Sequence, residues 1–575
     1  MSTKKKATPS VLINGFPGIR TSIPMDGNLG SVTMNNFRIT EEGALQKRNG
    51  FSPLHTSKDP IRAYFSTQIN NIPCLFLVRG ASVFMMNLKT QSAHLCGQIQ
   101  SDSAPVHFFY HQGNLYLLSG TTAYILNERS IKRTIGYIPL VGRDWPNNVV
   151  GEIYEPRNIL HNQARISYVI NDPPSIFLHT PYTIEKIHRV IRNGVDITDT
   201  EDYYLDENFN TVNILEPKVG DRITVYFSFQ NEDTTELDNL FSCQKNVLLG
   251  TTDQSRILLF DGNLPASVFC SSYVSNDHLK ESQAINSLSS ALYFPENCDF
   301  TVGNGQYRIQ GATHNRDRIL FFTQGITWVS ANSDAQAKGL TAHGMLPIGC
   351  VSDKGMLQTG NDTIFIGTNT IYRWESAADG SLRAVSISRN VDHLWDANFY
   401  KRARLAFDPT HNELWVTDSE QQETWICRLD SYDWFKFTGI PADEPIWLIN
   451  QMGFIHGSDI FRFVDGQNYD EDRDANQIPI SASYHAELGD LASPEIKTVR
   501  QILFHGYTKG GPVLVTLSGG DLPSPLSVLF RTNEEPPTVV SQKRCRSARF
   551  RCADLTIDAD ASSTSTVRRL SIYTK

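Results

Sequence analysis

The stretch of sequence that decides the fold is Asp362–Trp374, DTIFIGTNTIYRW. It begins at a polar turn, continues as a short apolar strand, turns again at polar residues, and ends in a second strand with aromatic side chains. Short runs of β-branched and aromatic residues bounded by Asn, Asp, Gly and Thr are typical of a β-hairpin. The same unit recurs at Asn114–Leu126, Asp317–Val329, Glu413–Cys427 and Met452–Phe463, with weaker copies at Pro73–Met85 and Asn246–Leu259.

The spacing of these hairpins indicates how they are assembled. The later copies start about 40 to 50 residues apart, which is the period of a propeller blade with four short strands. One hairpin cannot bury both of its apolar faces, so such units stack face to face around an axis. The seven copies predict an all-β protein with an irregular β-propeller of about six to eight blades. The alternative is an irregular β-sandwich, and the repeats carry neither a WD40 nor a kelch signature.

Two regions depart from the blade rhythm. Between residues 139 and 240, strand-like runs recur about every ten residues, and Asn193-Gly194 is typical of a two-residue hairpin turn, so we expect an inserted immunoglobulin-like β-sandwich. Beyond residue 466, strands separated by Pro, Gly and Ser predict a C-terminal β-sandwich. Helical periodicity is weak throughout. The predicted organisation is an extended N-terminal arm at 1–54, first blades at 55–138, the insert at 139–240, the remaining blades at 241–466 and the C-terminal sandwich at 467–575.

The composition excludes several classes of protein. The 575 residues include 52 Lys and Arg against 61 Asp and Glu, a net charge of −9, which is unsuited to gripping nucleic acid through phosphate neutralisation. No run approaches the ~20 apolar residues of a membrane-spanning helix, and the lysines near the start precede no signal-peptide core. The nine cysteines are scattered singly, without a Cys-x-x-Cys pair. They predict reduced, buried thiols in a protein made in a cytoplasm.

Motifs for catalysis or metal binding are missing from the sequence. It has no nucleophile elbow, P-loop, dinucleotide fingerprint or His-Glu-x-x-His. His107 and His111 have no third ligand nearby, so we interpret them as structural. Asp470–Asp474 resembles the opening of a calcium loop but lacks its later Gly and Glu, which favours a solvated loop. The basic run Lys543–Arg551 is a candidate phosphate contact. The simpler interpretation, which we favour, is that it forms the outer face of a strand. We therefore predict no catalytic residue, metal site or cofactor.

The segment 11–54 is unusually specific: VLINGFPGIRTSIPMDGNLGSVTMNNFRITEEGALQKRNGFSPL. Its glycines and prolines argue against a long helix or strand and predict an extended arm with turns. The segment resembles the N-termini of the tail nozzle and tail-hub proteins of short-tailed bacteriophages, in which a Gly-Ile turn, a Pro-containing loop, an Asn-Asn-aromatic step and a Glu-Gly-x-Leu-x-Lys-Arg element follow one another. The matching residues are Gly18, Ile19, Ile23, Pro24, Asn35, Asn36, Phe37, Glu42, Gly43, Leu45, Lys47 and Arg48.

The resemblance implies a structural protein of the virion, assembled in the host cytoplasm. Members of the family form a ring of six that extends the portal and adaptor channel, retains the packaged DNA and conducts it during ejection. Expected partners are further copies of the chain, portal or adaptor proteins, tail fibres or spikes, and genomic DNA that passes without sequence-specific binding. A negative chain suits a channel wall that repels phosphate, so we expect an acidic lumen.

The resemblance also assigns a role to the arm, which we expect to lie on a neighbouring subunit or adaptor. Lys47 and Arg48 suit an acidic partner there, and the alternative is that they cap the edge of the first blade. The residues expected to make this contact are Gly18, Ile19, Asn35, Asn36, Glu42, Gly43, Leu45, Lys47 and Arg48. Two other functions stay open: a propeller glycosidase or polysaccharide lyase with its site at the central channel, and a receptor-binding propeller.

Overall fold

The computed structural model describes residues 11–20, 30–147, 150–171, 177–206, 210–230, 233–249, 255–315, 318–330, 342–360, 362–376, 382–418, 420–488, 497–519, 524–532, 540–550 and 553–574. The chain forms two compact units. Unit 1 combines Met1–Pro60 with Cys350–Lys575, and unit 2 is Ile61–Gly349. No helix in the described ranges is both long and apolar enough to span a bilayer.

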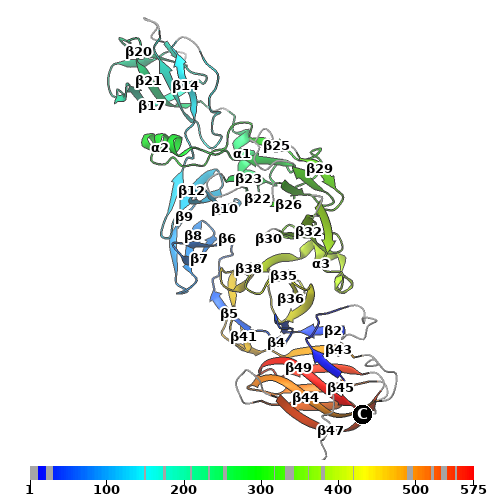
Figure 1. The fold of residues 1–575 in the computed structure, drawn as a ribbon. Helices are drawn as coiled ribbons and strands as arrows, with labels where there is room; N and C mark the ends of the chain where they lie inside the picture. Colours follow the sequence, from blue (N-terminus) through cyan, green and yellow to red (C-terminus); the bar gives the residue numbers. More distant parts are fainter. Residues whose placement is uncertain are drawn as a thin grey trace, which may run out of the picture. The chain divides into compact units, whose positions relative to one another are not determined.

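Unit 2 contains four sheets of four antiparallel strands, each made by consecutive segments of chain (Figure 1). The first has β6 (Ala63–Ile69), β7 (Ile72–Arg79), β8 (Ser82–Asn87) and β9 (Ala93–Gln98). The second has β10 (Val106–His111), β11 (Asn114–Ser119), β12 (Thr122–Leu126) and β13 (Ile131–Thr134). The third has β22 (Lys245–Leu249), β23 (Arg256–Phe260), β24 (Ser267–Cys270) and β25 (Asp299–Thr301). The fourth has β26 (Gly311–Asn315), β27 (Arg318–Phe322), β28 (Thr327–Ser330) and β29 (Ala342–Leu346).

A β-sandwich lies in sequence between the second and third of these sheets. Its larger sheet has the order β14-β15-β21-β17-β18 and its smaller sheet the order β16-β20-β19. The inward side chains of both sheets, among them Tyr168, Val212 and Phe227, are fully buried in one apolar cluster. The strands are β14 (Leu140–Pro146), β15 (Gln163–Val169), β16 (Phe177–His179), β17 (Ile184–Arg192), β18 (Val195–Asp196), β19 (Tyr203–Leu205), β20 (Thr211–Ile214) and β21 (Arg222–Phe229).

Unit 1 contains three more blades of four strands, of which the second is part of a larger sheet and the last is completed by a strand from the N-terminal segment. The first has β30 (Met356–Thr359), β31 (Asp362–Ile366), β32 (Ile371–Ser376) and β33 (Leu382–Ser386). The second has β34 (Arg404–Asp408), β35 (Glu413–Asp418), β36 (Glu423–Arg428) and β37 (Asp433–Thr438). The third has β38 (Glu444–Trp447), β39 (Met452–His456), β40 (Asp459–Val464) and, paired with β40, β5 (Gly50–His55).

The rest of unit 1 is a C-terminal sandwich joined to β41 (Tyr469–Glu471) and β42 (Gln477–Pro479). One of its sheets continues that of the second blade, in the order β34-β35-β36-β37-β2-β43-β48-β45-β46, and the other has the order β3-β4-β49-β44-β47 with β1 also on β49. Its strands are β43 (Ala482–Glu487), β44 (Lys497–Lys509), β45 (Val513–Ser518), β46 (Leu526–Phe530), β47 (Val540–Phe550), β48 (Asp554–Ala559) and β49 (Thr564–Thr574). The N-terminal strands are β1 (Val11–Asn14), β2 (Gly30–Asn35), β3 (Phe37–Ile39) and β4 (Leu45–Lys47).

The predicted all-β propeller fold is confirmed, and the described residues include seven blade-like sheets. Each of the seven repeated hairpins of the sequence lies in a different sheet, and six of them form its two central strands. These central strands are the most buried of a blade, which is why the repeat is strongest there. The helices among the described residues are α1 (Thr235–Ser242), α2 (Asn276–Ile285) and α3 (Ala397–Arg402), with a 3₁₀ turn at Asp392–Leu394. The seven cysteines whose side chains are described are buried and unbridged.

Candidate functional site

The N-terminal segment differs from the extended arm predicted for it. Its described parts, residues 11–20 and 30–55, are called the strap below, and they contribute five strands to unit 1. Strand β2 pairs with both β37 of a blade and β43 of the sandwich, while β1 and β4 pair with β49. Figure 1 shows β2 and β4 close to β43 and β49. The glycines do interrupt the segment, as expected, but the short strands of its described parts pair with other strands of unit 1. The strap thereby joins the last two blades to the C-terminal sandwich.

The Gly-Ile turn lies against the edge of β37. The backbone N–H of Gly18 donates to Asp433 Oδ1 at 3.2 Å, and that of Ile19 donates to the Trp434 carbonyl at 2.7 Å. A Cβ atom on residue 18 would lie 2.6 Å from the backbone nitrogen and oxygen of Trp434. Glycine is therefore required here for close approach of two backbones.

Gly18→Ala is expected to destabilise unit 1 by about 1–3 kcal/mol, because the added methyl meets backbone atoms that cannot turn away. Urea unfolding followed by tryptophan fluorescence measures the change. Gly325→Ala is the matched control, since a Cβ at that glycine meets nothing within 4 Å. Equal stability of the two variants would show that the Gly18 contact is not tight.

The Asn-Asn step ends β2 and turns the chain into β3. Asn35 pairs with Lys436 on one side and Ser483 on the other. Asn36 has a φ of 56°, a left-handed conformation that Asn tolerates better than most residues. Its amide nitrogen donates to Thr438 Oγ1 at 3.0 Å and to the Ser481 carbonyl at 2.8 Å.

The amide oxygen of Asn36 contacts Arg48 of the Lys-Arg element. It accepts hydrogen bonds from the Thr438 backbone at 2.8 Å and from Arg48 Nε at 2.9 Å. Arg48 in turn forms a bidentate pair with Asp470, Nη1 to Oδ1 at 2.8 Å and Nη2 to Oδ2 at 2.6 Å, and both side chains are 5% exposed or less. The expected solvated loop at Asp470–Asp474 is thus wrong for Asp470, because this carboxylate compensates a buried guanidinium. Asp474 is exposed as expected, and Asp472 is partly exposed.

Lys47 is buried on the other side of the strap. Its Nζ donates to the carbonyls of Asp560, Ala561 and Ser563 at 3.1, 2.9 and 2.7 Å, so all three ammonium protons have acceptors. Burial lowers the pKa of Lys47 to about 8, against the partly compensating charge of Asp560. A lysine in this position ties β4 to the turn between β48 and β49.

The remaining motif residues shape the turn between β3 and β4. Gly43 has a φ of 76°, and its carbonyl accepts the Phe16 N–H at 2.9 Å. Leu45 is fully buried in the apolar cluster of unit 1, whereas Glu42 is exposed. Lys47 and Arg48 therefore have their donors occupied by partners within unit 1. Contact of the strap with another subunit stays a prediction.

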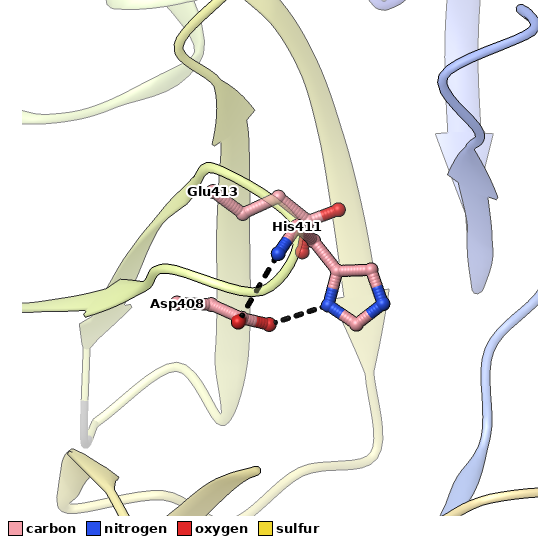
Figure 2. Close-up of side chains that lie close together, drawn as sticks. All are labelled: Asp408, His411 and Glu413. Atoms are coloured by element: carbon pink, nitrogen blue, oxygen red, sulfur yellow. Dashed lines mark hydrogen bonds and ion pairs between the residues drawn. The ribbon is translucent and has the colours of Figure 1, made fainter. Parts of the chain in front are cut away.

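A second cluster, which the sequence analysis missed, lies at the turn between β34 and β35 (Figure 2). Asp408 ends β34 and Glu413 begins β35, so the turn brings both near His411. The Oδ1 of Asp408 accepts the backbone N–H groups of Thr410 and His411 at 2.9 and 3.3 Å, and its Oδ2 lies 2.7 Å from His411 Nδ1. These bonds hold the imidazole against a buried carboxylate.

Arg38 of the strap closes the cluster from the other side. Its Nη1 lies 3.1 Å from His411 Nε2, and its Nη2 lies 3.1 Å from Glu413 Oε2. Because arginine only donates, Nε2 accepts, and a neutral imidazole then carries its proton on Nδ1 and donates it to Asp408. Burial raises the pKa of Glu413 despite the nearby Arg38. Burial also opposes ionisation of Asp408, but the hydrogen bonds from His411 and the Thr410 backbone and the charge of Arg38 outweigh it and lower the pKa of Asp408.

The residue types of this cluster suit a divalent transition metal, and their ligand atoms all lie within 4.8 Å of one another. Arg38, however, already supplies a positive charge and occupies the free nitrogen of His411. The two carboxylates are 3% exposed or less, so a substrate would reach neither without moving Arg38. The cluster is therefore compensated internally, and the residues present do not fit a metal while Arg38 stays in place.

Arg38→Ala is expected to convert the cluster into a cobalt site, because it frees His411 Nε2 and removes the competing charge. Addition of Co²⁺ to the variant should give visible d–d absorption, and the unsubstituted chain should give none. The double variant with His411→Ala is the control for ligation by the imidazole. Equal cobalt binding by the unsubstituted chain would contradict a compensating role for Arg38.

A pocket of about 410 Å³ opens beside this cluster. It lies between the sheet that contains β3, β4 and β49 and the blade that contains β35 and β36. Arginines and glutamates line it in equal number, which leaves it without a dominant charge. Its lining residues are Arg38, Ile39, Thr40, Glu41, Glu42, Ala44, Gln46, His411, Glu413, Arg428, Thr566 and Arg568. The ring nitrogens of His411 contact Arg38 and Asp408, and among the described residues no hydroxyl or thiol is hydrogen-bonded to this imidazole as a nucleophile would be.

The comparisons with known proteins match the fold alone. No family model and no curated protein matches the chain. It is similar to the β-propeller domain of Cps50 (Swd1) from Myceliophteria thermophila, with 9% identity over 72% of this chain and 99% of that chain at a TM-score of 0.33. The Pan2 WD40 domain of Neurospora crassa has 8% identity over 73% and 95%, at 0.35. Apo AztD from Citrobacter koseri has 11% identity over 70% and 86%, at 0.29.

Proposed function

We propose that the chain is a structural ring component of the tail of a short-tailed bacteriophage, a nozzle or hub that retains packaged DNA and conducts it during ejection. Six copies encircle the channel, and portal or adaptor proteins and tail fibres or spikes are the neighbours. In this proposal the protein is not an enzyme and resides in the virion tail. The proposal starts from the motif of the strap, which resembles that family.

The observation that best supports the proposal is what the strap motif does. Backbone groups at Gly18, the amide of Asn36 and the cations of Lys47 and Arg48 all bind partners in a blade or in the sandwich of unit 1. A catalytic motif would instead direct polar atoms to an open site. A motif whose residues join the blades of unit 1 to its C-terminal sandwich suits a structural protein that bears mechanical load.

The charge of the chain supports the same function. A net charge of −9 per subunit makes a ring of six strongly acidic, and an acidic wall repels the phosphates of passing DNA. Lysine and arginine contacts to phosphate would add counterion-release terms that resist movement. An acidic lumen is part of the proposal, and a reconstruction with a basic lumen would contradict it.

Negative-stain microscopy and native mass spectrometry of the purified chain test the proposal. We expect closed rings of six copies with an open pore, formed alone or on addition of the portal and adaptor. Particles that stay monomeric at all concentrations and with those partners would overturn it. Turnover of a polysaccharide by the same preparation would favour the glycosidase or lyase alternative.

A further inference from the structure

The outer face of the small sheet in the inserted sandwich carries two exposed aromatic rings. Phe177 on β16 and Tyr204 on β19 are each in register with Asn213 on the central strand β20, so the three side chains form one row across the sheet. The neighbouring residues Leu178, Val212 and Leu205 face the sandwich core instead. Phe177 is 47% exposed and Tyr204 is 48% exposed, and two strand spacings place their backbones about 10 Å apart.

A second row of the same face is polar. His179 is in register with Thr211, whose Oγ1 lies 3.1 Å from His179 Nδ1, and the Asp206 backbone N–H donates to the Thr211 carbonyl at 3.0 Å. The His179 ring also lies parallel to that of Phe177, with centroids 6.4 Å apart. The face therefore combines flat rings at its edges with an amide, a hydroxyl and a carboxylate between them.

Two acceptors of this face lack a donor in the protein. Asn213 is 1% exposed, and neither its Oδ1 nor Oδ1 of Asp206 has a hydrogen-bond partner. A buried acceptor without a donor costs roughly 1–3 kcal/mol, and natural proteins keep few of them. Donors brought by a ligand would satisfy both atoms.

We infer that this face, formed by Phe177, His179, Tyr204, Asp206, Thr211 and Asn213, binds a neutral carbohydrate chain. The C–H faces of sugar rings pack on the electron-rich faces of aromatic rings, and sugar hydroxyls supply donors in the plane between them. The Asp206 carboxylate gives the face a negative charge, which disfavours sulfated or uronic-acid chains. The inference does not depend on ring assembly, because the face lies within one sandwich of one subunit.

The test is binding of the full-length chain to an array of neutral gluco-, galacto- and manno-oligosaccharides printed beside sulfated and uronic-acid chains. We expect at least one neutral chain to bind. Phe177→Ala and Tyr204→Ala should each weaken that binding about tenfold or more, as measured by interferometry on the immobilised sugar. Tyr307→Ala is the matched control, since Tyr307 is 47% exposed on a different part of unit 2 and its loss should leave binding unchanged.

Asn213→Leu is the second variant and separates binding from folding. Because the substitution removes an acceptor that has no donor, the free protein should be at least as stable, while sugar binding falls. Binding of no neutral sugar, binding of anionic chains only, or equal loss in the Tyr307 control would each overturn the inference. Unchanged binding in the Phe177, Tyr204 and Asn213 variants would overturn it as well.

Discussion

Arg48→Met should destabilise unit 1 by about 3–5 kcal/mol, the largest effect that we expect from a single substitution. The change leaves the Asp470 carboxylate buried without its partner and also removes donors to Asn36 and the Thr438 carbonyl. Urea unfolding monitored by tryptophan fluorescence measures the loss.

Arg20→Met is the matched control for the Arg48 variant. Arg20 also pairs an aspartate across the strap, but its side chain is 39% exposed and the pair with Asp433 is 3.5 Å long. Exposed pairs of this kind contribute about 0–1 kcal/mol. The double variant Arg48→Met with Asp470→Leu should recover part of the loss, because it removes the unpaired charge. If the Arg48 and Arg20 variants unfold at the same urea concentration, the buried pair does not anchor the strap.

The second large effect is a dependence of stability on alkaline pH through Lys47. Its pKa is lowered by burial to about 8 in the folded chain, from 10.5 in the unfolded chain. Between pH 8 and 10.5 the unfolded state therefore binds more protons, and this group makes stability rise with pH across that window. Relative to Lys47→Met, the unsubstituted chain should gain on the order of 3 kcal/mol between pH 7.5 and 10.5.

Denaturant unfolding of both proteins at the two pH values isolates this contribution, because other titrating groups cancel in the difference. Lys436→Met serves as the control, since Lys436 is only partly buried beside Glu423. A difference between the unsubstituted chain and the Lys47 variant that stays constant with pH would show that Lys47 keeps an ordinary pKa in the folded protein.

The propeller could be predicted from sequence because its signal is local. Asp362–Trp374 alternates strands and turns within thirteen residues, and six of the seven copies form the two central strands of separate sheets. The strap could not be predicted in the same way. Strand β2 pairs with residues about 400 and 450 positions later, and its local sequence pattern does not predict which strands these are. Glycines at intervals of a few residues suggested an arm, although the runs between them are long enough to pair.

The Asp408 cluster also has one part that the sequence could have predicted and one part that it could not. The Asp-x-x-His-x-Glu spacing across a turn is visible in the sequence and could have been recognised as a carboxylate–imidazole group. Arg38, which decides that the group is compensated rather than open, lies 370 residues earlier and is brought there only by the strap. For the same reason, the burial of Lys47 and Arg48 depends on carbonyl and carboxylate partners that no spacing rule connects to them.

The strap also imposes an order on biosynthesis. Strands β1 and β4 leave the ribosome long before their partner β49 is made. At ordinary elongation rates this interval is on the order of a minute, during which β1 has no partner strand and β4 can pair only with β3. A product truncated before β49 cannot pair β1 or β4 with that strand, so this part of unit 1 is completed only after β49 has been made. The strand order of unit 1 therefore makes correct pairing of β1 and β4 depend on synthesis of β49.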